Sequence, residues 1–216
     1  MSLTPLTNNT KQAYLASTTY INWLEPSIQQ RAKQLAEACD NEEALVKSSF
    51  EFVRDHIKHS SDYQLNPITC KASEVLKHAT GFCYAKSHLL AALLRANQIP
   101  AGLCYQRLTI SDNKPPFCLH GLNAVYLQQH GWYRLDPRGN KPTIKAEFFP
   151  PIEKLAFPIV INGEADLPDI WTEPLPQIIE VLSQYNHYQQ VLDNLPDLPL
   201  ITTSATVTTN LQTNET

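Results

Sequence analysis

The chain is 216 residues long, which fits one domain with a short tail better than two independently folded units. Hydrophobic residues make up 43% and charged residues 18%, a balance that excludes a fully disordered chain, a coiled coil and a collagen-like repeat. The formal net charge is −4 and no clustered basic face is visible, so neither a nucleic-acid partner nor an anionic membrane is expected.

The sequence has no recognisable secretory signal and no membrane-spanning segment. Residues 1–10 are polar and lack the basic start and apolar centre of a secretory signal. No apolar run approaches the roughly 20 residues that a membrane span needs. We therefore expect a cytoplasmic protein, in which reduced thiols are the default state. The five cysteines, Cys39, Cys70, Cys83, Cys104 and Cys118, include no CxxC pair. Neither a disulfide framework nor a zinc site is therefore expected, and no cofactor is predicted.

The first part of the chain is predicted to be helical. Apolar residues recur at spacings of three and four over 27–39 and 41–58, with Asn41 as the expected N-cap of the second helix. Residues 59–69 are polar and predict a loop, and residues 73–78 predict a helical turn. The helices predicted over 27–39 and 41–58 each present one apolar face, as helices do when they cover a core.

The strongest helix signal covers residues 83–96. Thr80 precedes it and is expected to cap the amides of its first turn. Pro100 prevents the helix from continuing. The predicted buried stripe consists of Ala85, Leu89, Leu90, Leu93 and Leu94.

Beyond this helix the hydrophobic period changes from 3.6 to 2, which predicts strands. A loop is expected over 111–116 and a hairpin connection over 128–131, and the predicted strands are 101–110, 117–127 and 132–136. The last part of the chain is rich in proline, which predicts extended segments that wrap the body, with one helix over 175–192. Residues 201–216 have no periodicity and are expected to be a disordered tail.

Cys83 is the candidate nucleophile. A cysteine on an apolar helix, taken alone, is most simply a small buried hydrophobe. Cys83, however, begins the predicted helix, where unpaired amides and the helix dipole favour an anion and so a thiolate. A thiolate is the attacking species in acyl chemistry, and a helix-start amide can donate to the oxyanion that forms. The other four cysteines have no such context and are expected to pack.

His120 begins one predicted strand and Asp136 ends the next. If a three-residue loop over 128–130 joins them, position 138 lies opposite His120, and Asp136 lies on the same face within diagonal reach. A loop over 129–131 keeps the shared face but separates the two residues, and an even-numbered loop puts them on opposite faces. The sequence therefore permits this contact without requiring it.

The residues around these positions resemble a known family. The stretches ASEVLKHATGFCYAKSH at 72–88, LHGLNAV at 119–125 and WYRLD at 132–136 are similar to the transglutaminase-like superfamily, especially its bacterial members described as candidate cysteine proteases. The resemblance covers roughly residues 45–140. It implies an α+β, papain-like fold in which the nucleophile helix packs against an antiparallel sheet. The expected organisation is a single domain over 1–200, with a catalytic core at about 45–140 and a proline-rich wrap at 141–200.

The resemblance also implies roles for single residues. Cys83 is the nucleophile, His120 the general base and acid, and Asp136 the carboxylate that orients His120. Tyr84 matches the aromatic residue that often follows the nucleophile, and it is a candidate for contacting substrate or the oxyanion. Gln64 precedes Cys83 by a papain-like interval and is the candidate oxyanion side chain, although no motif fixes its loop.

The expected activity is attack on an amide carbonyl to form a thioester with Cys83. Water then gives hydrolysis, which is favoured, and an amine gives transfer. The expected substrate is a peptide, a protein or a small amide. A second hypothesis is a binding or scaffold module that keeps the fold without turnover, which predicts a broken triad or a filled cleft.

Overall fold

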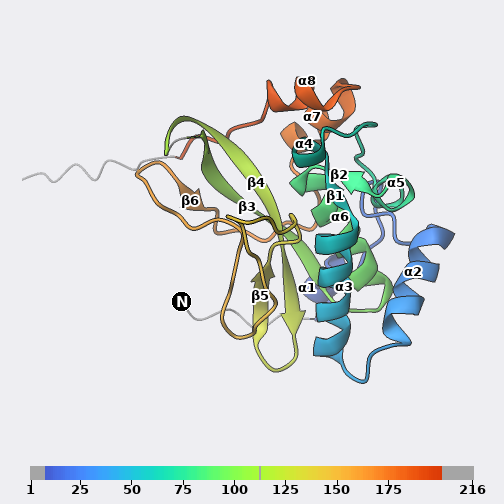
Figure 1. Ribbon diagram of the computed structural model, residues 1–216. Coiled ribbons are helices and arrows are strands. Elements are labelled where there is room, and N and C mark those ends of the chain that lie inside the picture. The colour runs from blue at the N-terminus through green and yellow to red at the C-terminus, as the bar shows by residue number, and fades with distance from the viewer. Residues whose placement is uncertain (1–7, 112, 201–216) are drawn as a thin grey trace, which may run out of the picture.

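A computed structural model of the protein describes residues 8–111 and 113–200, so the predicted tail over 201–216 lies outside the described residues. Figure 1 shows helices gathered on one side of an antiparallel sheet, the expected α+β arrangement. The helices are α1 (Asn8–Ala13), α2 (Pro26–Ala36), α3 (Glu42–His56), α4 (Ser60–Tyr63), α5 (Ala72–His78), α6 (Cys83–Ala96), α7 (Pro176–Gln184) and α8 (Tyr188–Leu192). The strands are β1 (Lys58–His59), β2 (Thr80–Gly81), β3 (Ala101–Ser111), β4 (Lys114–Leu127), β5 (Gly131–Leu135) and β6 (Ala165–Asp166).

Helices α2, α3 and α5 form close to where the sequence predicts helices, whereas α1 was not predicted. The predicted cap of α3 is confirmed, because the Asn41 side chain accepts a hydrogen bond from the Ala44 amide at 2.9 Å. Glu42 and Glu43 in the first turn complement the helix dipole. Among the described residues, no helix combines the length and the apolar character needed to cross a bilayer.

Helix α6 runs through the centre of the molecule, and its predicted bounds are confirmed. It contacts β3 and β4 on one side and α2, α3 and α5 on the others, so its residues from Cys83 to Arg95 are all buried, not only the predicted stripe. The predicted Thr80 cap is wrong. Phe82 is the N-cap and makes no side-chain cap bond, whereas the Thr80 hydroxyl donates to the Lys58 carbonyl at 3.0 Å.

The main sheet has the strand order β5–β4–β3–β6, and each neighbouring pair is antiparallel. The loop predicted over 111–116 is shorter in the structure, because Ser111 pairs with Lys114 and the β3–β4 hairpin continues past an irregularity after Thr109. At the other end of β4, Leu127 pairs with Gly131. The connection between β4 and β5 is therefore the three-residue loop considered for residues 128–130.

The predicted loop over 59–69 contains ordered elements. β1 pairs in parallel with β2, which aligns His59 with Gly81, and α4 follows directly. A two-residue strand is too short to produce a hydrophobic period, so the sequence pattern gave no sign of it.

The proline-rich segment returns to the sheet as β6 and then ends in two helices, where one was predicted. The break falls at residues 185–187, because His187 caps a new helix: its ring accepts from the Gln189 amide and its own amide donates to Gln190. In Figure 1, α7 and α8 lie at the end of the molecule that also holds α4, β1 and β2.

Candidate active site

Cys83 is the first residue of α6. Phe82 leads into it in an extended conformation, with φ −65° and ψ 165°. The first amides of a helix have no acceptor inside it, so they remain available at this end of α6. Cys83 is 8% exposed and lines a cavity.

His120 and Asp136 are brought together by the register of β4 and β5. Because Asn123 pairs with Leu135, Asp136 lies diagonally across from His120 on the same face. His120 Nε2–H donates to Asp136 Oδ2 at 2.7 Å. The contact that the sequence permits without requiring is therefore present in the fold.

Asp136 is fully buried and its hydrogen-bonding capacity is used. Its Oδ1 accepts from the Arg138 amide at 3.1 Å, and its Oδ2 also accepts from the Ala156 amide at 3.1 Å. Burial raises the pKa of Asp136, but His120 and these two amides outweigh it, and the net pKa is lowered. Asp136 is thus an ionised carboxylate held in one orientation.

His120 also faces Cys83. The amide of the next residue, Gly121, donates to the Cys83 sulfur at 3.5 Å. Because Nε2 is bonded to Asp136, Nδ1 is the nitrogen available to the thiol. Burial lowers the pKa of His120, but the charges of Asp136 and Cys83 and side-chain hydrogen bonds to both raise it to about 10. The surroundings of His120 therefore favour its protonated, imidazolium form.

The two other predicted site residues lie differently. Tyr84 is buried and lines the cavity beside Cys83, and its hydroxyl donates to the Leu119 carbonyl across the α6–β4 interface. Gln64 ends α4 with φ 54°, is exposed, and is not among the described residues that line the cavity. The structure therefore brings Tyr84 to the site but not Gln64.

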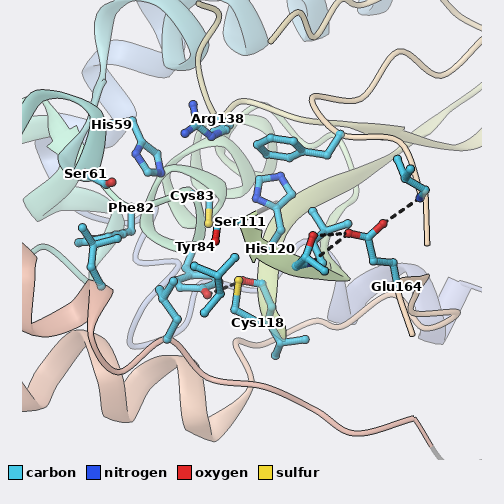
Figure 2. Close-up of a pocket in the computed structure, with 18 of the residues that line it drawn as sticks. His59, Ser61, Phe82, Cys83, Tyr84, Ser111, Cys118, His120, Arg138 and Glu164 are labelled. Carbon is cyan, nitrogen blue, oxygen red and sulfur yellow. Dashed lines mark hydrogen bonds between the residues drawn. The ribbon is translucent and has the colours of Figure 1, made fainter. Parts of the chain in front are cut away.

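A cavity of about 390 Å³ opens over Cys83 and His120 (Figure 2). Its apolar walls come mainly from the β3–β4 hairpin, from the segment after Ala156, and from the end of α8 and the residues after it. Phe157 meets the His120 ring edge to face at 5.0 Å. The chain that carries the C-terminal wall is tied to β4, since the Leu119 amide donates to the Pro196 carbonyl at 2.7 Å. The apolar lining residues include Phe82, Leu108, Ile110, Leu119, Phe157, Pro158, Val160, Leu192 and Leu195.

A polar cluster that the sequence pattern did not single out lies beside the cavity. Arg138 binds both oxygens of Asp62 at 2.7 and 3.0 Å, and it lines the cavity together with His59. Behind them, the buried Lys86 donates to the carbonyls of Arg54 and Ile57 at the end of α3. These residues come from segments far apart in the sequence, so no local motif could have identified the cluster.

Gly121 allows helix α6 to approach β4 closely. A Cβ atom at this position would lie 2.9 Å from Tyr84 Cδ1 and 3.1 Å from Tyr84 Cα. We expect Gly121→Ala to lower the free energy of unfolding by about 1–3 kcal/mol, as overpacking does, and to slow alkylation of Cys83. Urea denaturation and the rate of iodoacetamide labelling measure the two effects.

The control for this prediction is Gly131→Ala in the β4–β5 hairpin, where φ is 73°. Alanine is strained in this conformation, so stability should fall while the Cys83 alkylation rate stays at the wild-type value. A Gly121→Ala protein as stable and as reactive as the wild type would contradict the role assigned to this close approach.

The remaining cysteines and His88 lie outside this arrangement, apart from Cys118, which lines the cavity. All five cysteines fall within the described residues, and each is a free thiol. Burial lowers the pKa of His88 to about 4, and its Nδ1 bonds the Cys70 carbonyl at 2.7 Å, as expected of a structural histidine. Across residues 8–111 and 113–200, no group of three or more His, Cys, Asp and Glu side chains is placed to hold a metal ion.

Comparisons with known proteins identify the family. Among the solved structures similar to the chain is a putative cysteine protease from Cytophaga hutchinsonii, with a TM-score of 0.50 and 22% identity over 62% of this chain and 43% of that one. Another is the periplasmic domain of TgpA from Pseudomonas aeruginosa, with a TM-score of 0.48 and 21% identity over 61% of this chain and 48% of that one. The chain thus spans less than half the length of either, and at this identity the first likeness shows the fold. No curated protein matched. The family model of the transglutaminase-like superfamily matches residues 29–137, just over half of the sequence, and the chain belongs to this superfamily.

Proposed function

We propose that the protein is a cysteine-nucleophile amide hydrolase in which Cys83, His120 and Asp136 form the catalytic triad. The observation that carries the proposal is their linear arrangement at one cavity: Asp136 bonds His120 at 2.7 Å, and His120 in turn faces the Cys83 thiol. This is the order of contact that nucleophilic acyl chemistry needs.

The first half of the reaction acylates the enzyme. The Cys83 proton moves to His120 Nδ1, and the thiolate forms a bond to the substrate carbonyl carbon while the C=O π pair moves onto oxygen. When the oxyanion collapses, the C–N bond breaks and the leaving amine takes the proton from His120. The product of this half is a thioester on Cys83 and a free amine.

The second half regenerates the thiol. His120 takes a proton from water, and the resulting hydroxide adds to the thioester carbonyl to form a second oxyanion. Collapse breaks the C–S bond, releases the carboxylic acid and leaves the Cys83 thiolate beside the His120 imidazolium. Asp136 stabilises that imidazolium in both halves without taking the proton itself.

The cavity supports a substrate class as well as a reaction. Its walls are mostly apolar side chains, which fit an apolar group next to the scissile amide. A peptide, a protein segment or a small amide can present such a group. An amine acceptor in place of water would give transglutaminase-type transfer from the same thioester, and a cytoplasmic location stays a prediction.

The alternative of a silent binding module predicts a broken triad or a filled cleft. The hydrogen-bonded His120–Asp136 pair and the cavity of about 390 Å³ over Cys83 favour the enzyme.

Selective alkylation tests the proposal. Near neutral pH, iodoacetamide is expected to label Cys83 ahead of the other thiols, because a thiolate is the reactive form. Burial raises the pKa of Cys70, Cys104 and Cys118 to about 12, so these three remain thiols under the same conditions. Peptide mass spectrometry after a time course locates the label.

Labelling is best done in a Cys39→Ser background, because Cys39 is only half-buried and could add unspecific signal. In that background a Cys83→Ala variant should take up no label on the same time scale. Uniform labelling of the remaining thiols, or none at all, would refute Cys83 as the nucleophile.

A further inference from the structure

A second histidine, His59, lines the cavity on the side of Cys83 away from His120. β1 aligns His59 with Gly81, two residues before Cys83 in the chain. His59 is 7% exposed, and its ring meets Phe82 edge to face at 5.7 Å. Figure 2 shows the two histidine rings on either side of Cys83, both next to the same open space.

The hydrogen-bonding capacity of His59 is not used up by its neighbours. Within the described part of the chain, its buried Nδ1 has no hydrogen-bond partner. Asp62 Oδ2 lies 3.8 Å from Nδ1, beyond hydrogen-bond distance. Both Asp62 oxygens already accept bonds, from Arg138 and from Lys141. No contact therefore fixes the ring proton on Nδ1, and Nε2 can carry it.

The charges around His59 keep its ring neutral. Burial contributes most to lowering its pKa, and the Arg138 guanidinium lowers it further; Asp62 opposes them, and Lys86 and His120 add smaller repulsions. The pKa of His59 is therefore well below the ordinary value. A neutral imidazole cannot hand the substrate a proton as readily as an imidazolium, but its N–H remains a hydrogen-bond donor.

We propose that His59 is the side-chain donor of the oxyanion hole, with its Nε2–H and the backbone N–H of Cys83 both directed at the oxygen that becomes negative during acyl transfer. This inference rests on the proposed function. It also gives His59 the oxyanion role that the sequence suggested for Gln64, which does not line the cavity.

The two histidines lie on opposite sides of Cys83, which fits a reaction in which the leaving amine and the carbonyl oxygen of the substrate need different partners. The leaving amine must receive its proton from His120, so it lies on the His120 side of Cys83. The carbonyl oxygen then points to the other side, where His59 and the first amide of α6 lie. Donors that are already oriented in a buried site stabilise the developing charge without reorganising, which is the basis of oxyanion-hole catalysis.

The inference is tested by comparing two reagents that attack the same sulfur differently. Acylation by p-nitrophenyl acetate passes through an oxyanion, whereas alkylation by iodoacetamide displaces iodide and forms none. His59→Phe keeps a ring against Phe82 but removes the donor, and it should slow the burst of nitrophenolate about 100-fold or more. The rate of Cys83 alkylation should stay at the wild-type value.

His59→Gln supplies an amide donor and should recover most of the acylation rate, an outcome that a purely structural role would not give. His56→Phe makes the same substitution at an exposed position on α3 and should change neither rate. Circular dichroism and thermal unfolding confirm that each variant is folded.

The possible outcomes separate this inference from the proposed function. Equal acylation by wild type and a folded His59→Phe protein would overturn the role of His59, as would an equal loss of acylation and alkylation. If the wild-type Cys83 reacts with neither reagent, the proposed function fails, and the oxyanion role of His59 fails with it.

Discussion

Replacing Cys83 with alanine is expected to abolish product formation, with a loss of about 10⁴-fold or more, because no other group can form the thioester. The fold should persist, since the change removes one sulfur atom from a residue that lines a cavity. The measurement compares wild type and Cys83→Ala on a library of peptides and glutamine amides by mass spectrometry. A product that is lost in the variant defines the reaction and separates hydrolysis from transfer.

The matched control is Cys39→Ala, the same substitution at a half-buried cysteine after α2, which should leave every product unchanged. Persistence of the same products in Cys83→Ala would show that the chemistry lies elsewhere in the molecule. Loss of all products in Cys39→Ala as well would point to a general loss of folded protein.

The helix that carries Cys83 could be located from sequence because its signals are local. A run of apolar residues at helical spacing begins at Cys83, and Pro100 limits its end. The structure places α6 at Cys83–Ala96, as predicted. Its central position was not predictable in this way, since buried polar residues such as Lys86 and Arg95 read as a solvent-facing side until their partners are known.

The contact between His120 and Asp136 depended on the length and the position of the loop between two strands. The alternation of residues shows which face of a strand a side chain occupies, but a change of one residue in the length of the loop reverses the relation between strands. The pairing of Leu127 with Gly131 selects the loop over 128–130 among the alternatives. Sequence therefore identified the two residues, and the register brings them together.

The surroundings of the proposed triad could not be predicted, because they arise from pairings between short elements. His59 reaches Cys83 only through the two-residue pairing of β1 with β2. Arg138 is oriented by Asp62, 76 positions earlier in the chain. Gln64 was proposed from an interval in the sequence, but the same loop forms α4 and directs Gln64 to the exposed end of it.

The charged neighbours of His120 and His59 also explain how the two buried histidines can have different proposed roles. His120 lies next to the Asp136 carboxylate, which raises its pKa to about 10, whereas His59 lies next to the Arg138 guanidinium, which with burial lowers its pKa. One ring is therefore suited to hold a proton and the other to donate a hydrogen bond while neutral.

Asp136→Asn is expected to reduce the rate of product formation by about 10³-fold or more, as the loss of the orienting carboxylate does in other triads. The negative charge of Asp136 stabilises the protonated form of His120, so its removal must lower the pKa of His120 from about 10. The imidazolium will then be lost at a lower pH. NMR titration of the His120 ring and the alkaline limb of the rate profile measure this shift.

The same variant should lose about 1–3 kcal/mol of stability, because the asparagine amide group would face backbone N–H donors that the carboxylate now satisfies. Asp40→Asn, at an exposed position before α3, is the control and should change neither the His120 titration nor the rate. An unchanged His120 pKa in a folded Asp136→Asn protein would contradict the electrostatic role of Asp136. A lower His120 pKa together with an unchanged rate would show that Asp136 sets the charge of His120 without contributing to the rate of product formation.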